Sequence, residues 1–161
     1  MTRLPRSAAT PSPALAEGRG FTLVELVIVV LVLGILAQIA ISSYRNQVLR
    51  SRRSDAINAL SAVMQAQERW RSNAPSYAAT LATLNLGAIS SGGHYAIDLA
   101  GVGDPVGFNT GYEASAQPVR GDVQSGDEQC IQMKVRVEGG RVSYLAQDGQ
   151  SVDTSSQCWP R

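Results

Sequence analysis

The stretch GRGFTLVELVIVVLVLGILAQIAI, residues 18–41, decides the fold because it combines a long apolar run with one acid near its start. Residues 26–37 contain no charged or hydrogen-bonding side chain. Across the 21 residues 21–41, the polar side chains are Thr22, Glu25 and Gln38. A helix of this length rises about 30 Å, which matches the hydrocarbon core of a bilayer. The run therefore predicts a membrane-spanning helix.

Glu25 needs an explanation, because a charged group near a bilayer interior costs at least a few kcal/mol and is usually paired. A cleaved secretory signal has an apolar stretch of about 7–15 residues and a small-residue exit site. Here the run is longer and ends in Ala37-Gln38-Ile39-Ala40. A plain signal anchor would fit the length but would leave Glu25 without a purpose.

A cut between Gly20 and Phe21 accounts for the acid. It would create an α-amino group four residues before Glu25, on the same helix face. The start of a helix also favours negative charge. We therefore expect the new ammonium group, on this chain or a neighbouring one, to neutralise Glu25 within an apolar assembly.

The charge pattern bears on orientation. The net charge of +1 does not indicate the strong positive electrostatic field that attracts nucleic acids. Residues 1–20 contain three arginines and one glutamate, for a net charge of +2. A basic flank before an apolar run stays in the cytoplasm. We expect the amino terminus inside and the rest of the chain outside.

Cys130 and Cys158 both lie in the part that we expect to be exported. In an oxidising compartment an isolated pair in a small domain usually forms a disulfide. Its loop of about 29 residues would add roughly 3–4 kcal/mol in the chain-entropy picture. Two separate thiols are the alternative. A metal site is disfavoured, because His94 is the only histidine and is distant in sequence.

Residues 44–72 are polar and lack Pro and Gly, so the helix can continue to a total of about 50 residues. Apolar side chains recur at steps of three and four: Ala56, Ile57, Leu60, Val63, Met64, Ala66 and Trp70. The residues expected on the solvent-exposed face of this helix are Arg50, Arg53, Asp55, Asn58, Gln65, Glu68 and Arg69. The apolar stripe could dock a partner helix, but packing on the chain's own sheet is favoured.

The remaining residues predict a loop and a small sheet. The helix should end at residues 73–76, and residues 77–93 should form a loop with a short helical turn around Leu81, Leu84 and Leu86. Alternating residues predict strands at 94–99, 112–117, 130–137 and 141–146, with a break at 101–107. Glu138-Gly139-Gly140 indicates a hairpin turn. We expect an antiparallel sheet with one face against the helix, followed by an irregular tail at residues 147–159.

The sequence contains no pattern that favours an enzyme, and we expect no catalytic residue, cofactor or metal. His94 is better read as a half-exposed structural residue than as a base or ligand. Asp148 and Asp153 lack the dense ligand set of a calcium site. Four cations of the sheet region could form a basic patch that contacts DNA, although a solvated sheet face is the simpler interpretation: Arg120, Lys134, Arg136 and Arg141.

The sequence Gly20-Phe21-Thr22-Leu23-Val24-Glu25, followed by the apolar run, resembles the prepilin cleavage and methylation motif of type IV pilins and pseudopilins. The resemblance implies that a prepilin peptidase cuts after Gly20 and that Phe21 is N-methylated. It also implies that Glu25 pairs with the amino terminus of an adjacent subunit. Two features depart from the family pattern: the 20-residue leader is long, and Ser42 stands where a proline is frequent.

The resemblance implies an α+β pilin fold: one long helix, half transmembrane and half amphipathic, packed on a small antiparallel sheet with a disulfide-bounded carboxyl-terminal loop. The expected parts are the leader at 1–20, the transmembrane or filament-core half at 21–47, the amphipathic half at 48–73, the connecting loop at 74–93 and the β head at 94–161. Residues Pro75-Ser76-Tyr77, the single late cysteine pair and Cys158-Trp159 are most similar to PilE-type minor pilins.

The implied function is that of a structural, minor subunit of a type IV pilus that serves twitching motility, adhesion or DNA uptake. Implied partners are other pilin subunits through the amino-terminal helix, prepilin peptidase and the pilus assembly machinery. The chain would reside in the inner membrane before assembly and on the cell surface afterwards. The alternatives are a type II secretion pseudopilin and a tip-located adhesin or DNA-binding minor pilin.

Overall fold

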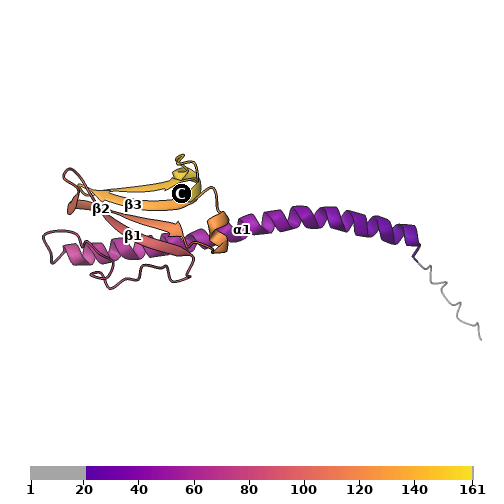
Figure 1. The fold of residues 1–161 in the computed structure, drawn as a ribbon, viewed down its shortest axis with the longest axis horizontal. Helices are drawn as coiled ribbons and strands as arrows, with labels where there is room; N and C mark the ends of the chain where they lie inside the picture. The colour runs from indigo at the N-terminus through magenta and orange to yellow at the C-terminus, as the bar shows by residue number, and fades with distance from the viewer. Residues whose placement is uncertain (1–20, 161) are drawn as a thin grey trace, which may run out of the picture. The chain divides into compact units, whose positions relative to one another are not determined.

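The computed structural model describes residues 21–160, and Figure 1 shows its helices and strands. The leader at residues 1–20, which includes the predicted cleavage residue Gly20, lies outside the described residues. The chain divides into two compact units, Met1–Ala40 and Ile41–Arg161. Helix α1 (Leu23–Arg71) has residues in both units.

Helix α1 has 49 residues, which confirms the expectation of one helix of about 50. The Thr22 hydroxyl accepts a hydrogen bond of 3.2 Å from the Glu25 backbone N–H and caps the first turn. The backbone is helical at both Gly34 and Ser42. A Cβ atom added at Gly34 would meet nothing within 4 Å, so this glycine is not required by a contact within the chain.

The stripe on the second half of α1 packs against the sheet, as the sequence predicted. Its fully buried members are Ala56, Leu60, Val63 and Ala66. Trp70 was expected to belong to the stripe, but it is 40% exposed because it lies in the last turn of α1. The expectation for Arg53 was also wrong, because its side chain is buried against an acid from the loop before β3.

The sheet is antiparallel with the order β1-β2-β3-β4, so each strand pairs with the next along the chain. The strands are β1 (Tyr95–Val102), β2 (Gly107–Pro118), β3 (Gln132–Glu138) and β4 (Arg141–Gln147). One face contributes Ile97, Ala114, Met133 and Val135 to a core shared with α1. Figure 1 shows the second half of α1 running along this sheet.

The first two strands are longer than the sequence predicted, because the glycines at 101 and 107 do not break them. Gly101 pairs with Tyr112, and the register shifts between Gly101 and Val102. A Cβ atom at Gly101 would lie 2.6 Å from the carbonyl oxygen of Gly107, so glycine permits a close backbone approach here. The β3–β4 turn is as expected, with positive φ angles of 57° at Gly139 and 79° at Gly140.

The connections are tied to the core by hydrogen bonds. The buried Gln67 side chain donates to the Ala78 carbonyl and accepts from the Ala78 N–H, both at 2.9 Å. The predicted turn near Leu81 is present, since the N–H groups of Leu84 and Leu86 bond to the Leu81 carbonyl. The tail is more regular than expected, because it contains the short helix α2 (Ser155–Cys158).

Candidate functional site

The first half of α1 presents an exposed apolar surface. An 18-residue window of this helix has a mean hydropathy of 2.8, and none of that window is buried within the chain. By length and composition the helix can cross a membrane. The large apolar side chains of residues 21–41 are each at least 47% exposed. Apolar area of this size requires lipid or other protein as its surroundings.

The predicted processing residues lie at the start of this surface. Phe21 is 81% exposed and precedes α1, while Glu25 lies in its first turn. Thr22 and Glu25 have the spacing of a capping box, in which the third residue after the cap is Glu or Gln. The Thr22 hydroxyl accepts from the Glu25 N–H, which is one of the two bonds of such a box. The sequence pattern T-x-x-E could have revealed it.

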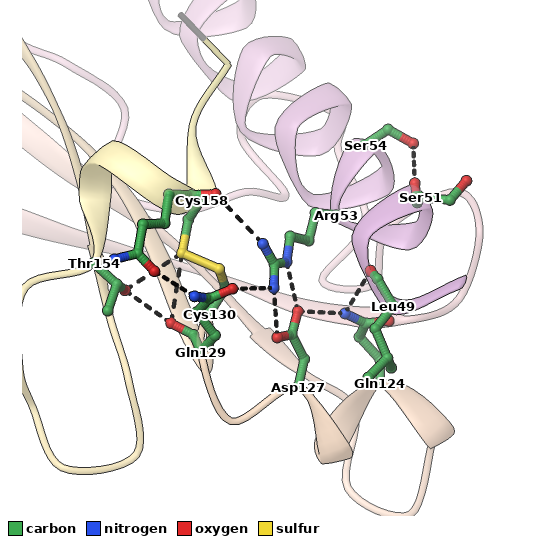
Figure 2. A network of polar contacts seen from close by, with 11 residues as sticks. Leu49, Ser51, Arg53, Ser54, Gln124, Asp127, Gln129, Cys130, Thr154 and Cys158 are labelled. Carbon is green, nitrogen blue, oxygen red and sulfur yellow. Dashed lines mark hydrogen bonds and ion pairs between the residues drawn. A yellow bond between two sulfur atoms is a disulfide. The ribbon is translucent and has the colours of Figure 1, made fainter. Parts of the chain in front are cut away.

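The second unit contains a buried polar clamp between α1 and the loop before β3, shown in Figure 2. The Arg53 guanidinium donates to both carboxylate oxygens of Asp127, at 2.7 Å and 2.8 Å. It also donates to the Gln129 side chain at 3.2 Å. The Gln124 amide donates to Asp127 at 3.1 Å and to the Leu49 carbonyl at 3.2 Å. These bonds hold the loop against the helix.

The disulfide between Cys130 and Cys158 lies next to this clamp (Figure 2). It joins residues 28 positions apart and confirms the predicted pairing. Both cysteines are buried. The Thr154 hydroxyl donates to the Gln129 carbonyl at 2.8 Å, and the Trp159 indole donates to the Leu145 carbonyl at 2.9 Å. The carboxyl-terminal segment is therefore fixed to both β4 and the loop before β3.

A third contact joins α1 to the start of β1. The Asp55 carboxylate accepts hydrogen bonds from the Ser90 hydroxyl at 2.5 Å and from the Gly92 N–H at 2.9 Å. Partial burial acts to raise the pKa of Asp55, but these bonds and that from the His94 N–H keep it below its ordinary value. The His94 ring contacts Asp122 at 3.2 Å, so this histidine has a structural partner.

The predicted basic patch on the sheet is neutralised by acids. Lys134 lies 3.1 Å from Glu113, and Arg136 lies 2.8 Å from Glu138. Arg141 is opposite Glu138 in the β3–β4 register. Arg120 lies apart from them, in the loop after β2. Because of this pairing, the outer face of the sheet lacks the uncompensated positive charge that attracts DNA.

The two aspartates considered for calcium have local roles. Asp148 accepts from the N–H groups of Gln150 and Val152, each at 2.8 Å. Hydrogen bonds from the Ser155 hydroxyl and N–H lower the pKa of Asp153. Within residues 21–160, the structure brings together no group of three or more His, Cys, Asp or Glu side chains suited to a metal ion.

Charge is divided between the helix and the remainder of the second unit. Residues 45–71 hold six arginines and two acids, for a net charge of +4. Residues 74–160 hold four cations and nine acids, for a net charge of −5. This division was not predicted from the overall charge or from the charge of residues 1–20, although counting charges in the later segments would have found it.

Comparison with known proteins places these features in a family. The family described as "Type IV minor pilin ComP, DNA uptake sequence receptor" matches residues 42–134, which are 93 of the 161 residues. The chain belongs to this type IV minor pilin family. The prokaryotic N-terminal methylation motif matches residues 18–41, the stretch that contains Gly20, Phe21 and Glu25.

Similar curated proteins share mainly a short part of this pilin. It is 52% identical over 40 residues to the fimbrial protein EcpC of Eikenella corrodens, covering 25% of this chain and 26% of that protein. It is 45% identical over 61 residues to the type IV major pilin PilA of Myxococcus xanthus, covering 38% and 28%. A fimbrial protein of Pseudomonas aeruginosa is 46% identical over 50 residues, covering 31% and 32%. The chain thus spans about a third or less of these relatives.

The matched families and relatives are structural pilins rather than enzymes. The long helix, the four-stranded antiparallel sheet and the carboxyl-terminal disulfide together form a pilin fold. Sequence reasoning identified the amino-terminal residues that lie within the matched motif. It missed the clamp of Arg53 and Asp127, because an arginine in a polar helix segment gives no sign of a buried partner 74 residues away.

Proposed function

We propose that this protein is a minor subunit of a type IV pilus, anchored in the inner membrane by α1 and then assembled with other pilins into an extracellular filament. The observation that carries the proposal is the exposed apolar half of α1, which follows directly on the methylation motif. Apolar helices without partners in their own chain can bundle in a filament as they do in lipid. The pilus and fimbrial relatives support a pilus over a secretion pseudopilus.

We further propose that processing occurs between Gly20 and Phe21, that Phe21 is N-methylated, and that Glu25 pairs with the amino terminus of a neighbouring subunit. The single membrane pass would place the amino terminus in the cytoplasm. Mass spectrometry of the protein from its host should find a mature chain that starts at N-methyl-Phe21, both in membranes and in sheared filaments. Gly20→Leu should leave the uncut chain in the membrane, because a bulky residue blocks access to the peptide bond.

Two results distinguish the filament type. Loss of twitching motility or DNA uptake on deletion of the gene supports the pilus, whereas loss of protein secretion with normal pili would contradict it. Recovery of the chain in sheared pili, at a small ratio to the other subunits, supports a minor role. A chain that stays in the membrane of piliated cells would overturn the proposal.

A second candidate function is DNA binding, since the matched family is described as a DNA uptake sequence receptor. Residues 74–160 are acidic overall and the cations of the sheet are paired with acids, so the end of α1 is the better contact. There Arg69 is exposed and Trp70 is 40% exposed. Arg71 lies 5.7 Å from the centre of the Tyr77 ring. An exposed aromatic ring between two arginines suits a phosphate backbone and an unstacked base.

The test is DNA binding by the detergent-solubilised full chain at several salt concentrations. Arg69→Ala and Trp70→Ala should each weaken binding by about five- to tenfold, and Arg69→Ala should reduce the salt dependence. Lys134→Ala is the control and should have little effect, because Glu113 already neutralises that lysine. Equal losses for all three variants would place the contact elsewhere, and no binding by the unsubstituted chain would remove this second function.

A further inference from the structure

A groove runs between α1 and the carboxyl-terminal segment of the second unit. It has a volume of about 480 Å³, and its walls include Arg50, Ile57 and Trp159. Arg50 is exposed and forms no ion pair with any residue that the structure describes, in contrast to Arg53 beside it. Glu128 lines a neighbouring hollow with Arg50 but does not pair with it. The groove thus combines one available cation with walls that are partly polar and partly apolar, the apolar part including Ile57 and Trp159.

The loop between β1 and β2 has the opposite character. Its residues Asp104, Pro105 and Val106 are all exposed, and Val106 is 78% exposed. Within the described part of the chain, Asp104 has no cationic partner at ion-pairing distance. An exposed valine next to an unpaired acid at a hairpin tip is a projecting feature that fits a groove of complementary charge.

The tip and the groove lie at opposite ends of the sheet. The tip is near the end of α1, because the Tyr77 N–H donates to the Phe108 carbonyl just after it. The groove is near the start of the second unit, where Arg50 and the disulfide lie. Figure 1 shows the carboxyl terminus at the end of the sheet away from the loop that joins β1 to β2. Complementary surfaces at opposite ends cannot meet within one molecule.

We propose that the β1–β2 tip of one copy of this protein docks in the groove of a second copy. The Asp104 carboxylate pairs with the Arg50 guanidinium, and Val106 packs against Ile57 and Trp159. The segment charges of +4 on the helix and −5 on residues 74–160 favour the same approach between copies. The second copy is the occupant because this chain itself supplies both the acid and the valine.

This contact is heterologous, so it joins two copies head to tail rather than closing a symmetric dimer, and it forms wherever two copies of this minor subunit lie next to each other. One hairpin tip in one groove buries far less than a stable interface needs. The contact therefore sets the register between heads whose association depends on the packing of the apolar helices. In this respect the inference rests on the proposed function as a filament subunit.

The first test is a cysteine crosslink between two tagged full-length versions that are expressed in the same cells. One version carries Val106→Cys and the other carries Ser54→Cys, a substitution in the groove wall. Mild oxidation should yield a crosslinked pair in membranes or sheared filaments. Thr80→Cys, which is exposed in the connecting loop, is the matched control and should crosslink at least several-fold less with Val106→Cys.

The second test exchanges the charges. Arg50→Glu or Asp104→Arg alone should lower the crosslinked fraction about two- to fivefold, the effect of a partly exposed ion pair. Combining Arg50→Glu in one version with Asp104→Arg in the other should restore it. Retention of the native disulfide, measured by thiol alkylation, checks that each variant is folded.

The outcomes separate the two proposals. If the unsubstituted chain enters filaments but Val106→Cys crosslinks no better than the control, the docking inference is wrong and the pilus assignment stands. A crosslink that the charge exchange does not restore, or a crosslink to a different pilin in place of this chain, also overturns the inference. A crosslink in membranes without any chain in filaments supports the docking contact and contradicts the filament function.

Discussion

Arg53 shows how one residue can decide the position of a whole loop. Its side chain is only 9% exposed and bonds to Asp127, whose side chain is 3% exposed. Two charges this deeply buried each lose hydration, and each depends on the other for compensation. The pair therefore favours this one position of the loop. Removing either residue alone leaves the other charge buried without a partner.

We predict that Arg53→Met destabilises the protein by about 3–5 kcal/mol, because Asp127 then stays buried without a counter-charge. The double variant Arg53→Met/Asp127→Leu should recover part of this loss. Arg52→Met is the control: its pair with Asp122 is 3.6 Å long and partly exposed, so the cost should be under about 1 kcal/mol. Denaturant unfolding of the detergent-solubilised chain measures all three, and equal costs for Arg52 and Arg53 would contradict the clamp.

Asp55 predicts a dependence of stability on acid. Its folded pKa is lowered relative to the ordinary value of 3.8, so the folded state binds the proton less readily than the unfolded chain. The stabilisation is therefore complete above pH 3.8 and is lost as the pH falls through the lower folded value. The melting temperature should drop as the pH falls below about 4, and Asp55→Asn should show a smaller drop. An identical pH profile for this variant would contradict the contribution of Asp55.

At the scale of elements, the sequence pattern predicted what depends on local periodicity. The helix, the β3–β4 hairpin and the buried stripe from Ala56 to Ala66 follow from spacing and turn residues. The long first hairpin was missed because Gly101 reads as a break in isolation, whereas tertiary structure uses it for a close strand contact. The prediction that Trp70 belongs to the buried stripe was wrong, because periodicity does not show at which residue the helix ceases to be covered.

The disulfide fixes α2 to the loop before β3, because it joins Cys158 to Cys130. We predict that replacing both Cys130 and Cys158 with serine lowers the free energy of unfolding by about 2–4 kcal/mol. The melting temperature of the native chain should fall on addition of a reductant, and that of the double variant should not respond to it. Thermal melts with and without reductant measure this effect. Equal responses in both proteins would mean that the bond does not stabilise the fold.

At the scale of the whole molecule, two surfaces are left for other molecules. The first half of α1 is apolar and unpaired within the described chain, while the second unit is divided into a basic helix and an acidic sheet region. Hydrophobic area drives association without direction, whereas charge selects orientation. In the proposed filament, helix packing would provide the strength of association, and contacts between the second units would set the register.

Glu25 has two proposed roles, one in capping the start of α1 and one in charge pairing between subunits. These two roles can be separated by substitution. Glu25→Gln keeps a residue that suits the third position of a capping box but removes the charge, whereas Glu25→Ala removes both. If charge pairing with a neighbouring amino terminus directs assembly, both variants should insert in the membrane, be cleaved before Phe21 and appear in sheared filaments at least tenfold less than the native chain. If only the helix cap matters, Glu25→Gln should assemble normally and Glu25→Ala should not. Quantitative blotting of membrane and filament fractions distinguishes the two cases, because normal incorporation of Glu25→Gln would remove the need for a charge at this position.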